Sequence, residues 1–210
     1  HSSDYEKLKH IPRPAHADYS ASVRYHDFSD PNGGGHFSGR LTAPLCAAGG
    51  VCLQILNRKG IAIGGHLSRC AGVDDAPIDS LRLTAEELAA VAQRPIPVLD
   101  ESAGMRMQEA VQAAKKEGDS VGGVIEVFAL GLPAGLGGPM FGGVENRLAQ
   151  AVFGIPAIRG VEFGAGFGAA DLRGSQNNDA FVLQEGIVRT KTNRHGGVLG
   201  GITTGMPLVM

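Results

Sequence analysis

The stretch Glu101–Leu130, ESAGMRMQEAVQAAKKEGDSVGGVIEVFAL, decides the fold class. Its first half has apolar residues at helical spacing, with Met107 and Val111 on one side, which predicts an amphipathic helix. Gly118 stands where helices commonly end, and Ser120–Leu130 is rich in Val and Ile with a period of two, which predicts a strand. A helix followed at once by a strand indicates a mixed α and β chain, in which antiparallel and parallel pairing are equally open.

Two helices and a strand are predicted on the N-terminal side of this stretch. Arg40–Asn57 consists of small and apolar residues with little polar relief, which is typical of a helix buried on most sides. Ile61–Ser68 alternates like a strand, and Thr84 with Glu87 three residues later forms a capping box that opens a helix. Residues 5–36, in contrast, are predicted to be mostly irregular because they contain prolines and turn residues.

The predicted elements on the C-terminal side are shorter. Val144–Phe153 is helical, and extended or glycine-broken segments follow at 158–163, 180–187 and 197–210. No sequence repeat of fixed period is present. Pro207–Met210 is an apolar strand end without a following turn, so we expect the chain to be cut there.

Composition narrows the function classes. The chain has 210 residues, 43% of them hydrophobic, and a net charge of −2 from 19 basic and 21 acidic residues, as in soluble globular proteins. The sequence has no basic cluster that would indicate a nucleic-acid partner. The most apolar run, Leu41–Leu56, has only 16 residues and contains Pro44, so we expect a buried helix rather than a membrane span.

The start of the chain and its cysteines indicate a cytoplasmic protein. His1–His10 is polar and lacks the apolar core of a signal peptide. Cys46, Cys52 and Cys70 form an odd set without metal-ligand spacing, so we expect no metal site. Cys46 and Cys52 fall on the apolar helix and are predicted to be buried thiols without chemistry.

One segment places a guanidinium, an imidazole and a carboxylate within six residues: Arg13-Pro14-Ala15-His16-Ala17-Asp18. Arginine binds phosphate or carboxylate with two hydrogen bonds. Histidine titrates near neutral pH, and a nearby carboxylate such as Asp18 orients such a ring in many catalytic sites. A loop held by an ordinary salt bridge is the simpler interpretation from composition, and spacing alone does not decide between the two.

A glycine run leads into the next helix, in the sequence Gly33-Gly34-Gly35-His36-Phe37-Ser38-Gly39-Arg40. Free N–H groups at a helix N-terminus favour an anion. Ser38 is placed to cap the helix, and Arg40 in its first turn either reaches a ligand or pairs with an acid. Because the lysine of a Walker sequence is absent, an anion site and a simple capping turn remain equal alternatives.

Two other glycine-rich segments also have two interpretations each. Gly164–Ala169 (GAGFGA) matches the dinucleotide fingerprint, but the polar, turn-rich Arg173–Asp179 (RGSQNND) follows it instead of a long helix, which argues against a nicotinamide site. Asn193–Ile202 (NRHGGVLGGI) contains two glycine pairs, which favour a β-bulge or an edge strand first and a backbone contact with a planar cofactor second.

Taken in order, five segments resemble the successive signatures of chorismate synthases. They are residues 13–18, 33–40, 118–123 (GDSVGG), 173–179 and 193–205. Each is weak alone, but five at compatible separations over nearly the whole chain identify a member of that family. The resemblance implies a single α/β (α+β) sandwich over residues 1–210, with a helical core between antiparallel β-sheets and with both ends truncated.

The resemblance implies a lyase of the shikimate pathway to aromatic amino acids. Such an enzyme converts 5-enolpyruvylshikimate 3-phosphate to chorismate and phosphate by a 1,4-anti elimination, assisted by reduced FMN without net redox change. Either the protein itself, by NADP-linked reduction, or a separate flavin reductase supplies the reduced flavin. A cytoplasmic homotetramer with flavin sites near subunit contacts is implied as well, without a nucleic-acid or membrane partner.

Roles for particular residues also follow from the resemblance. His16 is implied as the catalytic acid beside the reduced flavin, and Arg13 and Arg40 as residues that face the substrate anions. Contacts with FMN are implied for His36, Phe37, Ser38, Pro156, Ala157 and Gly200. The family more often has Arg-Ser-Ser at positions 36–38, and Phe37 lacks the hydroxyl that would donate a hydrogen bond there.

Two family segments have no counterpart in this chain. One is an N-terminal motif with a second histidine and several substrate-binding arginines, and the other is a set of C-terminal FMN loops with lysine and arginine. We therefore expect the 210-residue chain to bind FMN weakly and to turn over poorly or not at all. A catalytically inactive core fragment, acting only as a structural or oligomerising unit, is the first alternative, and a nicotinamide-dependent oxidoreductase using Gly164–Ala169 is the second.

Overall fold

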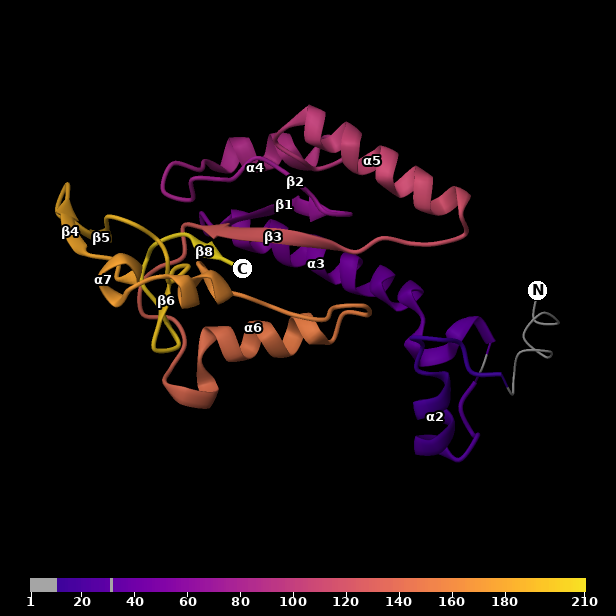
Figure 1. Ribbon diagram of the computed structural model, residues 1–210. Helices are drawn as coiled ribbons and strands as arrows, with labels where there is room; N and C mark the ends of the chain where they lie inside the picture. The colour runs from indigo at the N-terminus through magenta and orange to yellow at the C-terminus, as the bar shows by residue number, and fades with distance from the viewer. Residues whose placement is uncertain (1–10, 31) are drawn as a thin grey trace.

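The computed structural model describes residues 11–30 and 32–210, and an antiparallel sheet of four strands lies at its centre (Figure 1). The strand order is β2-β1-β3-β8. The strands are β1 (Ala62–Cys70), β2 (Val73–Asp74), β3 (Gly123–Leu130) and β8 (Leu208–Val209). The mixed α/β class is thus confirmed, and every strand pair of this sheet is antiparallel.

The two long strands, β1 and β3, determine which side chains meet across the sheet. His66 lies opposite Glu126 in the register of the pair. The register shifts between Leu67 and Arg69, which is a β-bulge in β1. The predicted strand at the end of the chain is confirmed, because β8 pairs with the C-terminal half of β3.

Two helices cover one face of the sheet, α4 (Ala85–Ala92) and α5 (Glu101–Lys116) (Figure 1). The predicted capping box is present, because Glu87 N–H donates to Thr84 Oγ1 at 3.2 Å and Thr84 N–H donates to the Glu87 carboxylate at 2.9 Å. The apolar stripe of α5 faces the sheet and buries Met107 almost completely. Both helices therefore follow from their local sequence.

Three small apolar clusters join these helices to the strands and form the core. The residues of the first are Cys70, Val98 and Met107; those of the second are Leu88, Phe128 and Val209; and those of the third are Ala129, Val198 and Leu208. The third cluster also contacts α6 (Val144–Phe153), a helix that was predicted with the same bounds. The C-terminal segments are thereby attached to the sheet through its β3 and β8 strands.

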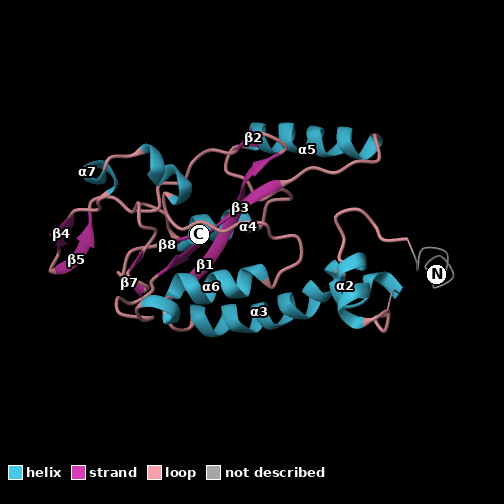
Figure 2. Ribbon diagram, turned by 60° about the horizontal axis from the view of Figure 1, so that its bottom comes forward, coloured by secondary structure: helices cyan, strands magenta, loops and turns pink. Residues whose placement is uncertain are grey.

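Helix α3 (Thr42–Asn57) lies on the other side of β1 from α5 in both views (Figures 1 and 2), and Figure 1 shows α4 on the same side as α5. The helix itself is confirmed, but the expectation that it is buried on most sides is wrong for this chain, because none of its residues is buried. Val51 is 57% exposed, and Cys46 and Cys52 are exposed rather than buried. The reason is that β1 contacts only one side of the helix, and no other described element covers the rest.

The exposure of α3 bears on whether the apolar run Leu41–Leu56 is a core helix or a membrane span. With the preceding short turn, the helical segment Gly39–Asn57 has 19 residues and is long and apolar enough to cross a membrane by length and composition alone. The core helix of a soluble protein has the same composition. The third cysteine, Cys70, is buried in the core below α5.

The N-terminal region is more ordered than predicted. Residues 18–25 form helix α2 (Asp18–Tyr25), which ends at His26 in the left-handed conformation, with φ of 51°. Two short segments follow, the turn η1 (Asn32–Phe37), in which Gly33, Gly34 and Gly35 have non-helical backbone angles, and the 3₁₀ turn η2 (Gly39–Leu41). The helix was missed because its only apolar positions are weakly periodic, whereas Asp18 in the first turn favours a helix start electrostatically. The part of the prediction on residues 5–10 lies outside the described residues.

The C-terminal region consists of hairpins and short turns. The predicted extended segment 180–187 is a hairpin of β4 (Phe181–Gln184) and β5 (Ile187–Thr190), and a second hairpin joins β6 (Val198–Leu199) to β7 (Ile202–Thr203). The segment 158–163 forms no strand. The remaining elements are the turns η3 (Met140–Gly142) and η4 (Gly166–Asp171) and the one-turn helix α7 (Gly174–Asn177).

Candidate active site

A cluster of charged side chains forms where the chain enters α2. The Arg13 guanidinium binds the Asp18 carboxylate with two hydrogen bonds, Nε–Oδ2 at 2.7 Å and Nη2–Oδ1 at 2.8 Å. The backbone N–H of Arg13 also donates to Asp18, at 3.0 Å. This pairing holds the pKa of Asp18 well below its usual range, chiefly through the Arg13 hydrogen bond. Asp18 is therefore a fixed negative charge at the start of the helix.

His16 lies within this ion pair. Its Nδ1 is 2.7 Å from Asp18 Oδ1, so the ionised carboxylate accepts the proton on Nδ1 and sets the orientation of the ring. Arg13 Nη2 lies 3.1 Å and 3.3 Å from the two ring nitrogens, so the guanidinium rests against the imidazole. The side chain of His16 is 24% exposed, and its Nε2 lies between Arg13 Nη2 and the glycine run.

The glycine run lies against the same ring. Gly34 has a φ of +83°, and a Cβ added there would lie 3.4 Å from His16 Nε2 and 3.7 Å from Arg13 Nη2. Gly35 has a φ of +52°, and its added Cβ would lie 2.3 Å from a backbone carbonyl. Only glycine fits these positions without strain. The run thus packs its buried backbone against His16, with Arg13 and Ser38 beside it.

Arg40 and Ser38 complete the cluster on the side of α3. Arg40 Nη1 donates to the carbonyl of Gly33 at 2.9 Å, and Ser38 Oγ accepts from Arg40 N–H at 3.3 Å. Ser38 therefore caps the turn that leads into α3, as predicted, and the guanidinium of Arg40 braces the glycine run. His36 and Phe37 follow the glycines in the same turn.

The other predicted cofactor contacts lie elsewhere in the chain. Pro156 and Ala157 are in the turn after α6, where Ala157 has a left-handed φ of 72°. Gly200 is in the turn between β6 and β7, towards the opposite end of the molecule from α2 (Figures 1 and 2). The structure therefore brings together Arg13, His16, Arg40 and residues 36–38, but not Gly200 with that cluster.

The dinucleotide-like segment lacks the geometry of its fingerprint. No strand precedes Gly164, and the 3₁₀ turn Gly166–Asp171 follows in place of an α-helix of several turns. A Cβ added at Gly164 would lie 2.1 Å from the Arg194 carbonyl and 2.4 Å from Gly196 N. These glycines serve close backbone packing, which agrees with the interpretation that no nicotinamide site is present here.

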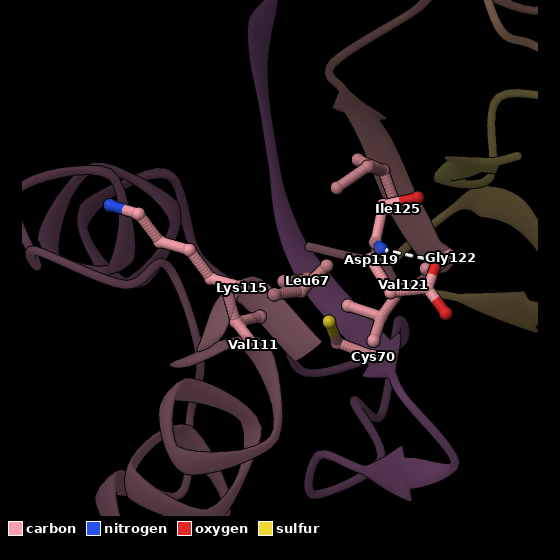
Figure 3. Close-up of a pocket in the computed structure, with 10 residues that line it drawn as sticks. Leu67, Cys70, Val111, Lys115, Asp119, Val121, Gly122 and Ile125 are labelled. Atoms are coloured by element: carbon pink, nitrogen blue, oxygen red, sulfur yellow. Dashed lines mark hydrogen bonds between the residues drawn. The ribbon is translucent and has the colours of Figure 1, made fainter. Parts of the chain in front are cut away.

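An apolar groove lies between α5 and the sheet, and the GDSVGG segment forms part of its wall (Figure 3). It has a volume of about 500 Å³ and includes Leu67, Cys70 and Val111. Figure 3 shows Lys115 extending away from Ile125 and the strand. None of the residues of the His16 cluster lines this groove.

A buried polar cluster in the sheet was not predicted from the sequence. His66 is 2% exposed, and its Nδ1 lies 2.7 Å from Asp75 Oδ2 while its Nε2 lies 2.9 Å from Glu126 Oε2. Burial opposes the charged ring, but the hydrogen bonds to Glu126 and Asp75 outweigh it and raise the pKa of His66 above 6.5. No local motif indicates this cluster, because His66 and Glu126 are 60 positions apart.

A second buried pair was also missed. Asp179 accepts hydrogen bonds from the N–H groups of Arg194 and His195, at 3.0 Å and 2.9 Å, and from the Thr192 hydroxyl. His195 Nε2 lies 3.1 Å from Asp179 Oδ2, although not in line for a good hydrogen bond. Burial lowers the pKa of His195 despite the nearby carboxylate. Both residues fall in segments that the sequence analysis had quoted, but their pairing was not visible there.

Comparisons with known proteins agree on one family. A family model described as chorismate synthase matches residues 1–210. The curated chorismate synthase of Thermococcus kodakarensis is 49% identical over 209 residues, which is all of this chain and 57% of that protein. The chorismate synthase of Lancefieldella parvula is 44% identical, over 98% of this chain and 57% of that protein.

A solved structure gives the same result. A crystal structure of chorismate synthase superposes with a TM-score of 0.79 at 33% identity, over 90% of this chain and 60% of that one. The chain thus spans a little more than half the length of the curated relatives that it matches. On the match over its whole length and on the shared fold, this chain belongs to the chorismate synthase family.

Proposed function

We propose that this protein takes part in the lyase reaction of its family, the conversion of 5-enolpyruvylshikimate 3-phosphate to chorismate and phosphate. In this 1,4-anti elimination the C–O bond to phosphate and a ring C–H bond break, and a new C=C bond forms. The family match over residues 1–210 carries the proposal. The placement of His16 with Arg13, Asp18 and the glycine run supports it, because these groups suit an anionic ligand.

His16 is the proposed catalytic acid of this site. Asp18 holds its Nδ1, and Nε2 faces the glycine run and lies 3.3 Å from Arg13 Nη2, so Nε2 is the atom proposed to donate or hold a proton once a ligand displaces the guanidinium. Arg13 and Arg40 are the proposed substrate-binding residues. Because Arg13 pairs with Asp18 and Arg40 with the Gly33 carbonyl, each arginine also positions the loop that it serves.

Reduced FMN is the proposed cofactor, and when bound it supplies an electron-rich ring that assists the elimination and is regenerated. His36, Phe37 and Ser38 are the proposed contacts with it in this region, because they follow the glycine run that packs against His16. Pro156, Ala157 and Gly200 are proposed as further contacts. The proposed assembly is a cytoplasmic homotetramer. Its reduced flavin comes either from NADP-linked reduction by the protein itself or from a separate reductase.

A specific observation favours a second candidate, a catalytically inactive core. The chain covers about 57% of its curated relatives, and its most apolar helix, α3, has no buried residue. A thiol reagent tests whether an assembly covers this helix, because Cys46 and Cys52 are exposed and Cys70 is buried. Protection of all three thiols indicates that another copy covers α3 and supports the oligomerising core, whereas fast labelling of two thiols indicates an uncovered helix and contradicts that role.

The decisive test is anaerobic turnover of 5-enolpyruvylshikimate 3-phosphate with photoreduced FMN, followed by chorismate absorbance. The chain, checked by intact mass, is compared with His16→Ala and with His26→Ala, an exposed histidine outside the cluster. Chorismate formation that is lost only in the His16 variant supports both the lyase and its acid. No turnover by a well-folded 210-residue chain supports the inactive core, and equal turnover by His16→Ala contradicts the role of His16.

A further inference from the structure

The cluster around His66 joins three separate parts of the chain. His66 belongs to β1, Glu126 to β3, and Asp75 to the segment after β2. Asp75 is fully buried and accepts two more hydrogen bonds, from the N–H groups of Leu99 at 2.7 Å and Asp100 at 2.9 Å. Asp100 is the N-cap of α5. An unbroken series of hydrogen bonds therefore runs from the middle of the sheet to the start of α5.

The geometry of this cluster favours a His66 ring that carries a proton on both nitrogens. Both ring nitrogens of His66 lie within hydrogen-bond distance of a carboxylate oxygen. A neutral imidazole carries one N–H, so it satisfies one carboxylate and presents a lone pair to the other. An imidazolium donates to both carboxylates. The ring of Phe128 lies beside His66, with the two ring centroids 6.3 Å apart and the planes inclined by 25°.

We propose that His66, held as an imidazolium between Asp75 and Glu126, is a pH-sensitive latch that fixes the start of α5 to the sheet. Loss of the ring proton leaves one carboxylate without a donor. Glu126 is the member that is released, because its side chain is 33% exposed whereas that of Asp75 has no exposed surface. Asp75 keeps the N–H of the neutral ring, but this bond is no longer charge-assisted, so the hold of His66 on Asp75 and on the start of α5 weakens.

Other charged groups lie near the His66 ring, but they do not contact it and so do not take the place of Asp75 or Glu126 as its partners. A cavity of about 380 Å³ lies beside His66 and is also lined by Asp79, Arg82, Glu87 and Arg94. Arg94 donates to the carbonyls of Val98 and Leu99, Glu87 caps α4, and Arg82 lies 3.5 Å from Asp79. Their charges are engaged in these contacts, so the two carboxylates that touch the ring decide its protonation.

The direction of the pH effect follows from the raised pKa of His66. The stabilisation is fully present below the ordinary value of 6.5 and is lost as pH rises through the folded-state pKa. For each unit by which the pKa of His66 in the folded state exceeds 6.5, protonation of the ring favours folding about tenfold. The folding equilibrium constant is larger at low pH than at high pH by that factor. The latch therefore opens on the alkaline side.

The first test is ¹⁵N NMR of the histidine rings in the 210-residue chain between pH 5 and pH 9.5. The expected result is a His66 ring in the imidazolium form at pH 7, with exchange of the Leu99 and Asp100 amides rising more than the usual tenfold per pH unit once that ring deprotonates. A neutral His66 ring at pH 7 overturns the proposal, even with a protonated Glu126. A ring that titrates without any effect on the two amides overturns the latch.

Urea unfolding over the same pH range gives an independent test. The folding constant of the parent chain is expected to fall at least tenfold between pH 6 and pH 9 relative to His66→Gln, in which nothing titrates at this position. Glu126→Gln keeps a polar side chain at a partly exposed site and is expected to move the fall to lower pH. His16→Gln is the matched control, from an exposed histidine–carboxylate pair, and is expected to follow the parent. Identical profiles for the parent, His66→Gln and Glu126→Gln contradict the proposal.

Discussion

The His16 cluster and the His66 cluster are built from the same residue types but in opposite surroundings. His16 and Asp18 are two positions apart and partly exposed, and Arg13 from the same loop neutralises the carboxylate. His66, Asp75 and Glu126 come from three parts of the chain and meet in the core. The surface ring has one carboxylate partner and a guanidinium beside it, whereas the core ring has a carboxylate at each nitrogen.

The comparison is tested first by removing the carboxylate from each cluster. Asp75→Ala leaves Nδ1 of His66 and the N–H groups of Leu99 and Asp100 without an acceptor in the core, so we expect a loss of about 3–5 kcal/mol in the free energy of unfolding. Asp18→Ala breaks a partly exposed pair and is expected to cost about 0.2–1 kcal/mol. Urea unfolding measures both, and equal losses would remove the distinction between the clusters.

The second prediction concerns the glycine run at the exposed cluster. Gly35→Ala places a Cβ 2.3 Å from the Asp30 carbonyl in a backbone conformation that is nearly restricted to glycine, so we expect a loss of about 1–3 kcal/mol. Gly39→Ala is the matched control, because Gly39 has an ordinary φ and open space around it, and it is expected to change stability by at most about 1 kcal/mol. Thermal unfolding of both variants provides the measurement. A Gly35 variant as stable as the control would show that the run adopts another conformation.

The third prediction separates the clusters by pH. The pKa of Asp18 is depressed, so its contribution to stability is present above its ordinary value of 3.8 and is lost as pH falls through the lower folded value. The His66 contribution is lost at the alkaline end instead. We expect the Arg13 Nε resonance to report the acid transition by NMR and Asp18→Asn to abolish it. An Arg13 resonance that also titrates in the alkaline range would indicate that the two clusters are coupled.

The smallest expected effect is that of His16→Gln on stability. Because the ring is partly exposed and Asp18 keeps its bonds to Arg13, we expect a change within about 0.5 kcal/mol in urea unfolding. Chorismate formation, where the chain supports it, is expected to fall sharply in the same variant. A large loss of stability would instead place His16 among the structural residues, like His66.

Local sequence patterns were sufficient for much of the fold. The helix Glu101–Lys116, the capping box at Thr84 and the strand ending at Leu130 depend on neighbours within a few positions, so spacing and caps predicted them. The helix Asp18–Tyr25 was missed because it has little apolar periodicity and its start depends on the bonds that Asp18 makes with Arg13. The burial of α3 was overestimated, because composition shows what a helix is suited to contact and not what covers it in this chain.

In the candidate site, too, some features were predictable from the sequence and others were not. The grouping of Arg13, His16 and Asp18 was visible in the sequence because all three lie in one short loop, and the family resemblance linked them to Arg40 and the glycine run. The sequence by itself thus determined the family, the main helices and strands, and this local charged cluster. Only the tertiary structure decided that His66 meets Asp75 and Glu126 in the core and that Gly200 lies apart from His16, because strand register and helix packing act between residues that are far apart in the chain.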